Sequence, residues 1–134
     1  MSDQIVCWGN YSSDLTDVDA PSGTYVDLDL SYWNSCALDD GGTAWCWGWY
    51  NSIAHGLTQV GSGYYYGCGI QTDESLSCWG TSGIFDQTET GDIPGPPDGE
   101  FVQISTAEEH ACALTTNAEV ECWGDNYYGE SSPP

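Results

Sequence analysis

The chain has 134 residues, of which 21 are acidic and none is Lys or Arg, and its formal net charge is −21. Without cationic side chains it cannot release counterions from a phosphate backbone, so nucleic acid and anionic membrane surfaces are poor partners. The 7 Trp and 9 Tyr residues distinguish it from disordered acidic segments, which contain few aromatic residues. We therefore expect one folded domain over residues 1–134.

The first expected element is a strand over residues 4–9, which contains the triplet Cys7-Trp8-Gly9. This segment has the sequence of the closing strand of a sheet, and residues 1–18 are predicted to form a lone strand followed by a connector. Cys7 is the odd one among 7 cysteines, which indicates either an intermolecular disulfide or a buried free thiol.

The connector carries three closely spaced carboxylates, Asp14, Asp17 and Asp19. Carboxylate oxygens are the ligands that Ca²⁺ prefers, although the spacing does not match an EF-hand loop. Because acidic residues are dense throughout the chain, a solvated acidic face is the more economical interpretation. A Ca²⁺ site is the alternative, and no other cofactor is expected.

The Cys-Trp-Gly triplet recurs three more times, each time with another cysteine ten positions upstream. Folding each segment about its middle gives an antiparallel hairpin in which the two cysteines lie opposite each other, within disulfide reach. The predicted disulfides join Cys36 to Cys46, Cys68 to Cys78 and Cys112 to Cys122. Three such pairs indicate an oxidising compartment, so we expect an extracellular or cell-surface protein.

A third strand is expected before each hairpin, because apolar residues there recur at nearly alternate positions. These residues are Val26, Leu28 and Leu30, then Leu57 and Val60, then Val102 and Ile104. The predicted fold is therefore all-β, with repeat units at residues 19–50, 51–82 and 83–134, the last including the C-terminal tail.

The third unit shows a family resemblance, from Phe101-Val102-Gln103-Ile104-Ser105 through Cys112-Ala113-Leu114 to the run between Val120 and Gly129. It resembles a regulator-of-chromosome-condensation repeat of the cysteine-containing bacterial type. In that family each repeat forms one four-stranded blade of a β-propeller, and a complete ring has about seven blades. The resemblance implies about three blades plus one N-terminal strand.

An arc of three blades would leave blade faces and strand edges exposed, which invites association. A second copy completing a ring, copies stacked into a filament, and an unusual compact three-blade arrangement are the alternatives. Candidate intermolecular contacts are Cys7, Trp8, Trp49 and Tyr65. The last two lie in aromatic runs that suit a protein interface or a sugar-stacking surface.

Catalysis is not expected, because His55 and His110 are the only bases that titrate near neutral pH and neither lies in a nucleophile motif. The favoured hypothesis is a non-enzymatic extracellular structural protein that associates with itself. The alternative is a monomeric module that recognises another protein or a glycan. The nucleotide-exchange and chromatin roles of the resembling family are not carried over, since the chain lacks both a full ring and basic residues.

Overall fold

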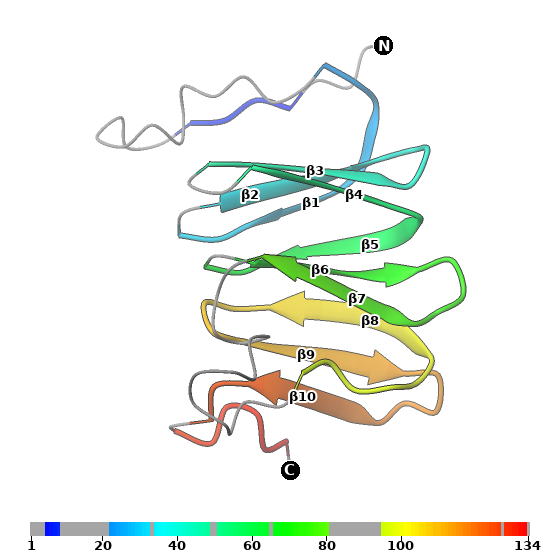
Figure 1. Ribbon diagram of the computed structural model, residues 1–134, viewed down its shortest axis with the longest axis vertical. Helices are drawn as coiled ribbons and strands as arrows, with labels where there is room; N and C mark the ends of the chain where they lie inside the picture. The colour runs from blue at the N-terminus through cyan, green and yellow to red at the C-terminus, as the bar shows by residue number, and fades with distance from the viewer. Residues whose placement is uncertain are drawn as a thin grey trace.

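Three antiparallel sheets are stacked along the long axis of the molecule (Figure 1). The computed structural model describes residues 5–8, 22–32, 34–48, 51–64, 66–80, 95–126 and 128–133. Within these ranges, no helix is long and apolar enough to cross a membrane. The all-β fold class predicted from the sequence is confirmed.

Each sheet is a meander of neighbouring strands. The first sheet has the order β1 (Tyr25–Leu30), β2 (Asn34–Asp39), β3 (Thr43–Gly48) and β4 (Ser52–His55). The second sheet has the order β5 (Leu57–Ser62), β6 (Tyr66–Gln71) and β7 (Leu76–Gly80). The third sheet contains β8 (Phe101–Thr106), β9 (His110–Thr115) and β10 (Val120–Gly124).

All three predicted hairpins form in the predicted register, and each is closed by its own disulfide. Cys36 lies opposite Cys46, Cys68 opposite Cys78, and Cys112 opposite Cys122, and every pair is bonded. Each bond closes a chain segment with a sequence separation of 10. On the chain-entropy model, a loop of this size stabilises the folded state by about 3 kcal/mol.

The three hairpin turns share one backbone geometry. Gly42, Glu74 and Ala118 occupy equivalent positions with φ angles of 79°, 68° and 65°. The N–H of each donates to the carbonyl three residues earlier, which is the arrangement of a type I turn followed by a left-handed residue. Glycine has the least strain at this position, but the repeated turn imposes the same conformation on Glu74 and Ala118.

Two sequence expectations need correction. The first sheet has a fourth strand, β4, which pairs with β3, so the first unit extends to His55 and does not end at residue 50. Residues 5–8 lie outside all ten strands, although a strand was expected over residues 4–9. A strand is stabilised by a paired neighbour, and the described part of the chain pairs no strand with this segment.

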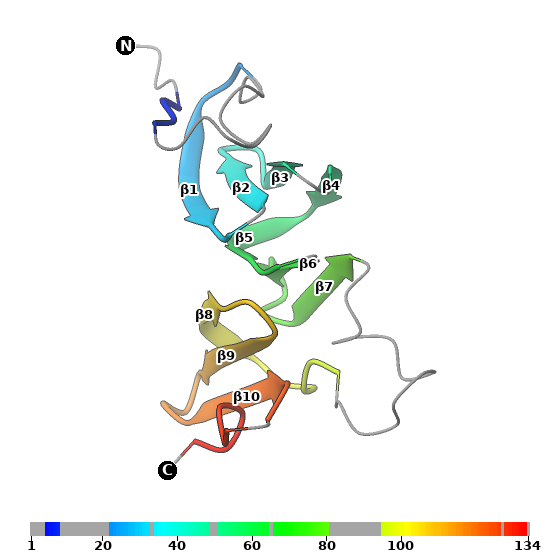
Figure 2. The same cartoon turned by 90° about the vertical axis from the view of Figure 1, so that its left-hand side faces the viewer.

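The first strands of the three sheets, β1, β5 and β8, lie side by side along one edge of the stack (Figure 2), and we call them the inner strands. Two apolar cores lie between neighbouring sheets. The first contains Leu38 and Leu57, and the second contains Ile70, Phe101 and Trp123. The Trp of the triplet packs between neighbouring sheets at Trp79 and Trp123.

Candidate functional site

Each sheet has two unlike faces, which we call forward and rear. The forward face carries the disulfide and, in the first two sheets, packs against the next sheet along the chain; the rear face is the opposite one. Cys36, Leu38 and Ala44 of the first forward face pack against Leu57 and Val60 of the second rear face. Burial of a side chain of this size is worth about 1.5–3 kcal/mol.

The second forward face repeats this contact with the third rear face. Tyr66, Cys68 and Ile70 pack there against Phe101 and other rear-face residues. The same two surfaces therefore meet twice within one chain.

In the first two sheets, the side chain nine residues before the first cysteine of the hairpin links the first strand of its sheet to the first strand of the next sheet. In the first sheet, Asp27 Oδ2 accepts a hydrogen bond of 3.1 Å from the main-chain N–H of Val60. In the second sheet, Gln59 Oε1 accepts an equivalent bond of 3.2 Å from the N–H of Ile104. An edge N–H of each receiving strand thus finds its partner in the preceding sheet.

Asp29 extends this link across all three sheets. Its Oδ2 atom accepts hydrogen bonds from the Ser62 N–H at 2.7 Å and from the Thr106 hydroxyl at 2.9 Å. Between them lies Gly61, where an added Cβ would come within 2.6 Å of the Thr106 methyl group. The missing side chain at Gly61 therefore permits contact between the first and third sheets.

Two further links recur at the ends of the strands. The side chain two residues before the first cysteine donates to a carbonyl of the next sheet's loop: Asn34 Nδ2 to Tyr64 O at 2.8 Å, and the Tyr66 hydroxyl to Ala107 O at 2.9 Å. Burial raises the pKa of the Tyr66 hydroxyl well above its ordinary value, so it remains a donor.

The second of these links joins a turn to the next strand through main-chain atoms. The Gly42 carbonyl accepts from the Leu57 N–H at 3.0 Å, and the Glu74 carbonyl from the Phe101 N–H at 2.8 Å. The left-handed turn position therefore also anchors the first residue of the following sheet.

The forward face of the third sheet displays the same set of groups without a next sheet in the described part of the chain. Gln103, His110 and Ala118 occupy the three linking positions. The side chains of Gln103 and His110 make no hydrogen bond with any described residue. Val120, equivalent to the buried Ala44, is 50% exposed.

The rear face of the first sheet is its counterpart at the other end of the stack. Leu28 and Leu30 are 46% and 61% exposed there, whereas the equivalent Val60 of the second sheet is 5% exposed. Trp47 is buried on this face, and its Nε1 has no hydrogen-bond partner among the described residues. The equivalent Trp79 Nε1 donates to Ser52 of the preceding sheet. Part of this rear face is therefore covered, and the inner strand β1 is open.

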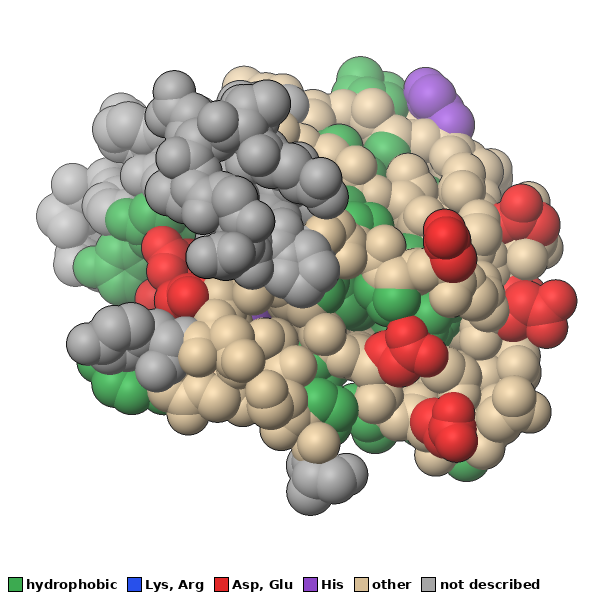
Figure 3. Space-filling view, turned by 60° about the horizontal axis from the view of Figure 1, so that its bottom comes forward, with side chains coloured by type: hydrophobic (Ala, Val, Ile, Leu, Met, Phe, Trp, Pro, Cys, Tyr) green, Lys and Arg blue, Asp and Glu red, His purple; other side chains and the backbone are tan. Residues whose placement is uncertain are grey.

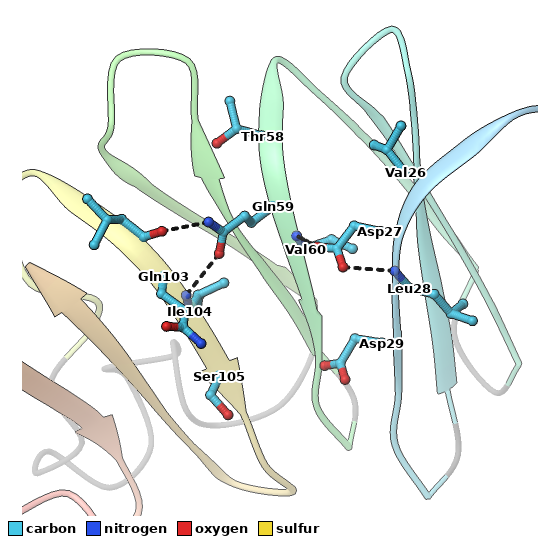
Figure 4. Close-up of a pocket in the computed structure, with 11 residues that line it drawn as sticks. Val26, Asp27, Leu28, Asp29, Thr58, Gln59, Val60, Gln103, Ile104 and Ser105 are labelled. Carbon is cyan, nitrogen blue, oxygen red and sulfur yellow. Dashed lines mark hydrogen bonds between the residues drawn. The ribbon is translucent and has the colours of Figure 1, made fainter.

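A polar groove of about 540 Å³ follows the inner strands (Figure 4). Its lining includes carboxylates, amides and hydroxyls from β1, β5 and β8. These polar residues are Asp27, Asp29, Thr58, Gln59, Gln103 and Ser105. Acidic side chains also project from other parts of the surface (Figure 3), so the groove lies in a negative field.

Of the residues predicted as contacts and ligands, the structure describes Cys7 and Trp8. Cys7 is a free, exposed cysteine, and Trp8 beside it is 85% exposed. The predicted contacts Trp49 and Tyr65 and the predicted Ca²⁺ ligands lie outside the described residues; the ligands are Asp14, Asp17 and Asp19. The described residues contain no cluster of three or more acidic, His or Cys side chains suited to a metal ion.

Sequence reasoning missed the linking residues Gln103 and His110. The signal was present, because they stand at the same distances before Cys112 as Asp27 and Asn34 do before Cys36. The residue types differ between units, however, and only the structure shows that the equivalent residues of the first two sheets perform one task.

Solved structures with a similar fold are propellers much longer than this chain. The CRINKLY WD40 ectodomain of the receptor kinase ACR4 from Arabidopsis thaliana has a TM-score of 0.77 and 23% identity, covering 98% of this chain and 47% of its own length. The ectodomain of the receptor kinase CR4 from Physcomitrella patens has a TM-score of 0.71 and 27% identity, covering 92% of this chain and 36% of its own.

Prp20p from Saccharomyces cerevisiae is similar over 92% of this chain and 41% of its own, with a TM-score of 0.65 and 12% identity. The chain thus spans less than half the length of each of these proteins. No curated protein sequence matches it. The family model of the regulator of chromosome condensation (RCC1) repeat matches residues 101–130. Those residues are therefore an RCC1 repeat, and the three sheets are blades of the propeller type.

Proposed function

We propose that the protein is a non-enzymatic, extracellular protein-interaction module whose principal binding surface is the forward face of the third sheet, and that its partner is a second copy of the chain. Copies joined in this way would form a ring or a filament. The extracellular assignment is supported by the three disulfides and by the likeness to two receptor ectodomains.

One observation carries the proposal. The third forward face repeats, position by position, the surface that the first two sheets bury against a following sheet. Its disulfide, Leu114 and Val120 correspond to the buried disulfide, Leu38 and Ala44 of the first sheet. A surface of this composition is stabilised when the rear face of another sheet covers it.

A non-catalytic role is supported by the placement of the two histidines. His55 lies on β4, 3.3 Å from the Thr43 hydroxyl, and His110 lies on β9 of another sheet. Neither histidine has an acidic side chain within a described hydrogen bond, which the nucleophile–base–acid arrangement of a triad requires. Among proteins of similar fold, Prp20p has binding properties toward Gsp1p and histones, which is an interaction role.

The groove favours a second candidate function, recognition of a glycan or another protein by a monomer. Its amides, hydroxyls and carboxylates suit a ligand rich in hydroxyl groups. The groove and the forward face share Gln103 and Ser105, but Val102 lines the groove whereas Val120 lies on the forward face outside it, so a substitution at one valine need not disturb the other surface.

Two valines of the third sheet separate these functions. Val120 on the forward face and Val102 in the groove are 50% and 47% exposed, so they form a matched pair. We expect light scattering of the oxidised wild-type protein to give a mass above the 14.5 kDa of one chain, increasing with salt as the repulsion is screened. Val120→Asp should give a monomer, because it places a charge in the apolar contact.

Val102→Asp is the control and should associate like the wild type. A wild-type protein that stays monomeric at every salt concentration would overturn self-association. Loss of association in Val102→Asp with none in Val120→Asp would move the binding surface to the groove.

A further inference from the structure

We propose that association is head-to-tail: the forward face of the third sheet packs on the inner strand β1 of a second copy, with Gln103, His110 and the Ala118 carbonyl as the linking groups. This inference rests on the proposed function and adds to it the identity of both surfaces.

The main-chain N–H of Leu28 on β1 is the first group that a second copy would bind. Its equivalents in the next two sheets, the N–H groups of Val60 and Ile104, donate to a side chain of the preceding sheet. Leu28 has no preceding sheet in the described part of the chain, and its N–H donates to Oδ1 of its own neighbour Asp27 at 3.0 Å (Figure 4). Gln103 of a second copy is the side chain that matches this donor.

The ends of the strands supply a second set of matching groups. Asn34 and Tyr66 donate to the loop that follows the next inner strand. The equivalent acceptor in a second copy is the Ser31 carbonyl, and the equivalent donor is a ring nitrogen of His110. The Ala118 carbonyl in turn occupies the position of the Gly42 and Glu74 carbonyls, which accept from the first residue of the following sheet.

Both proposed surfaces also expose apolar side chains. The forward face offers Leu114 and Val120, and β1 offers Leu28 and Leu30, all partly or largely exposed. Trp47 is already buried on the rear face, so the contact is confined to the inner part of that face. This is the part where the side-chain links to a preceding sheet are made elsewhere in the chain.

A symmetric forward-to-forward contact satisfies these groups less well. It would pair two identical surfaces, and the Ala118 carbonyl of each copy would face a surface that supplies no matching edge N–H. An unsatisfied buried carbonyl costs about as much as a lost hydrogen bond. Head-to-tail contacts are heterologous, so they close into a ring or continue as a filament, depending on the rotation between copies.

The test mixes two variants that each retain one surface. Val120→Asp disables the forward face, and Leu30→Asp disables the inner strand at a side chain that is 61% exposed. Each variant alone should be monomeric by light scattering. An equimolar mixture should form a 1:1 dimer and nothing larger, because only one contact between an intact forward face and an intact β1 is available.

The outcomes separate this inference from the proposed function. If Leu30→Asp alone still associates while Val120→Asp does not, the forward face binds but its partner surface is not β1, and the inference fails while the proposed function stands. If Val120→Asp associates like the wild type, both fail. Circular dichroism of each variant must match that of the wild type, and Leu28→Asp serves in place of Leu30→Asp if the latter misfolds.

A second measurement addresses the linking side chain. Gln103→Leu removes the acceptor at similar volume and should weaken association about five-fold, the effect of one hydrogen bond. Gln103→Asp keeps an acceptor oxygen of the kind that Asp27 supplies between the first two sheets, so at high salt it should associate more tightly than Gln103→Leu. Equal association of the wild type and both variants would remove Gln103 from the contact.

Discussion

The junction between the first and second sheets and the junction between the second and third use the same positions with different side chains. Both junctions contain an apolar core and a side-chain acceptor for a main-chain N–H. The first junction adds the carboxylate of Asp29 and a buried Asn34, whereas the second is filled by the large aromatic residues Tyr66, Phe101 and Trp123. One backbone arrangement is thus stabilised by two kinds of chemistry.

This difference shows where the repeat is constrained. The disulfides, the turn geometry and the N–H groups of the receiving strands are the same at both junctions, so they define the unit. Side chains that fill the space between sheets vary, as long as the volume and the hydrogen bonds are supplied.

The largest expected effect is at the aromatic junction. Phe101→Ala removes a side chain that is almost fully buried between the second and third sheets. We expect the free energy of unfolding to fall by about 3–5 kcal/mol. Urea denaturation of the oxidised protein measures it, with Val102→Ala as the control, since Val102 is half-exposed on the same strand and should change stability by less than about 1 kcal/mol. Similar losses in the two variants would contradict the assignment of Phe101 to the core.

A smaller effect is expected at the polar junction. Asp29→Ala leaves the Ser62 N–H and the Thr106 hydroxyl without their acceptor. An unsatisfied buried donor costs about 1–3 kcal/mol, so the midpoint of urea unfolding should fall accordingly. Asp40→Ala removes the same charge from an exposed turn and should leave the midpoint unchanged or slightly higher. If both substitutions shift the unfolding midpoint equally, Asp29 affects stability through its charge alone.

Local pairings could be predicted from the sequence because they depend on residues close in the chain. The cysteine spacing fixes the hairpin register, and Leu38 opposite Ala44, Ile70 opposite Leu76 and Leu114 opposite Val120 follow from it. The triplet spacing likewise indicates three repeat units.

The contacts between sheets could not be predicted in the same way. Alternation shows that Leu28 and Leu30 share one side of β1, but not that this side points away from the second sheet. The aspartates that alternate with them, Asp27 and Asp29, make the contact with β5, because they reach its edge N–H groups. The strand β4 was missed because Ser52–His55 is short and lies in a segment rich in turn-forming residues.

The smallest expected effect is the acid sensitivity of the first hairpin turn. Hydrogen bonds from the Thr43 N–H, the Trp45 indole and the Gly41 N–H lower the pKa of Asp39. A group with a lowered folded-state pKa adds stability that is present above its unfolded pKa, about 3.9, and is lost as the pH falls through the folded value.

The third hairpin supplies the control for Asp39, because Thr115 holds the equivalent position and its hydroxyl accepts from the Glu119 N–H without titrating near this pH. We therefore expect Asp39→Thr to keep the turn and to flatten the pH dependence of the unfolding midpoint between about pH 5 and pH 2 relative to the wild type. The carbonyl oxygen of Gly42 in this turn accepts a hydrogen bond from the Leu57 N–H, so weakening the turn also weakens the first junction. A parallel pH dependence in the wild type and Asp39→Thr would show that other carboxylates control acid unfolding.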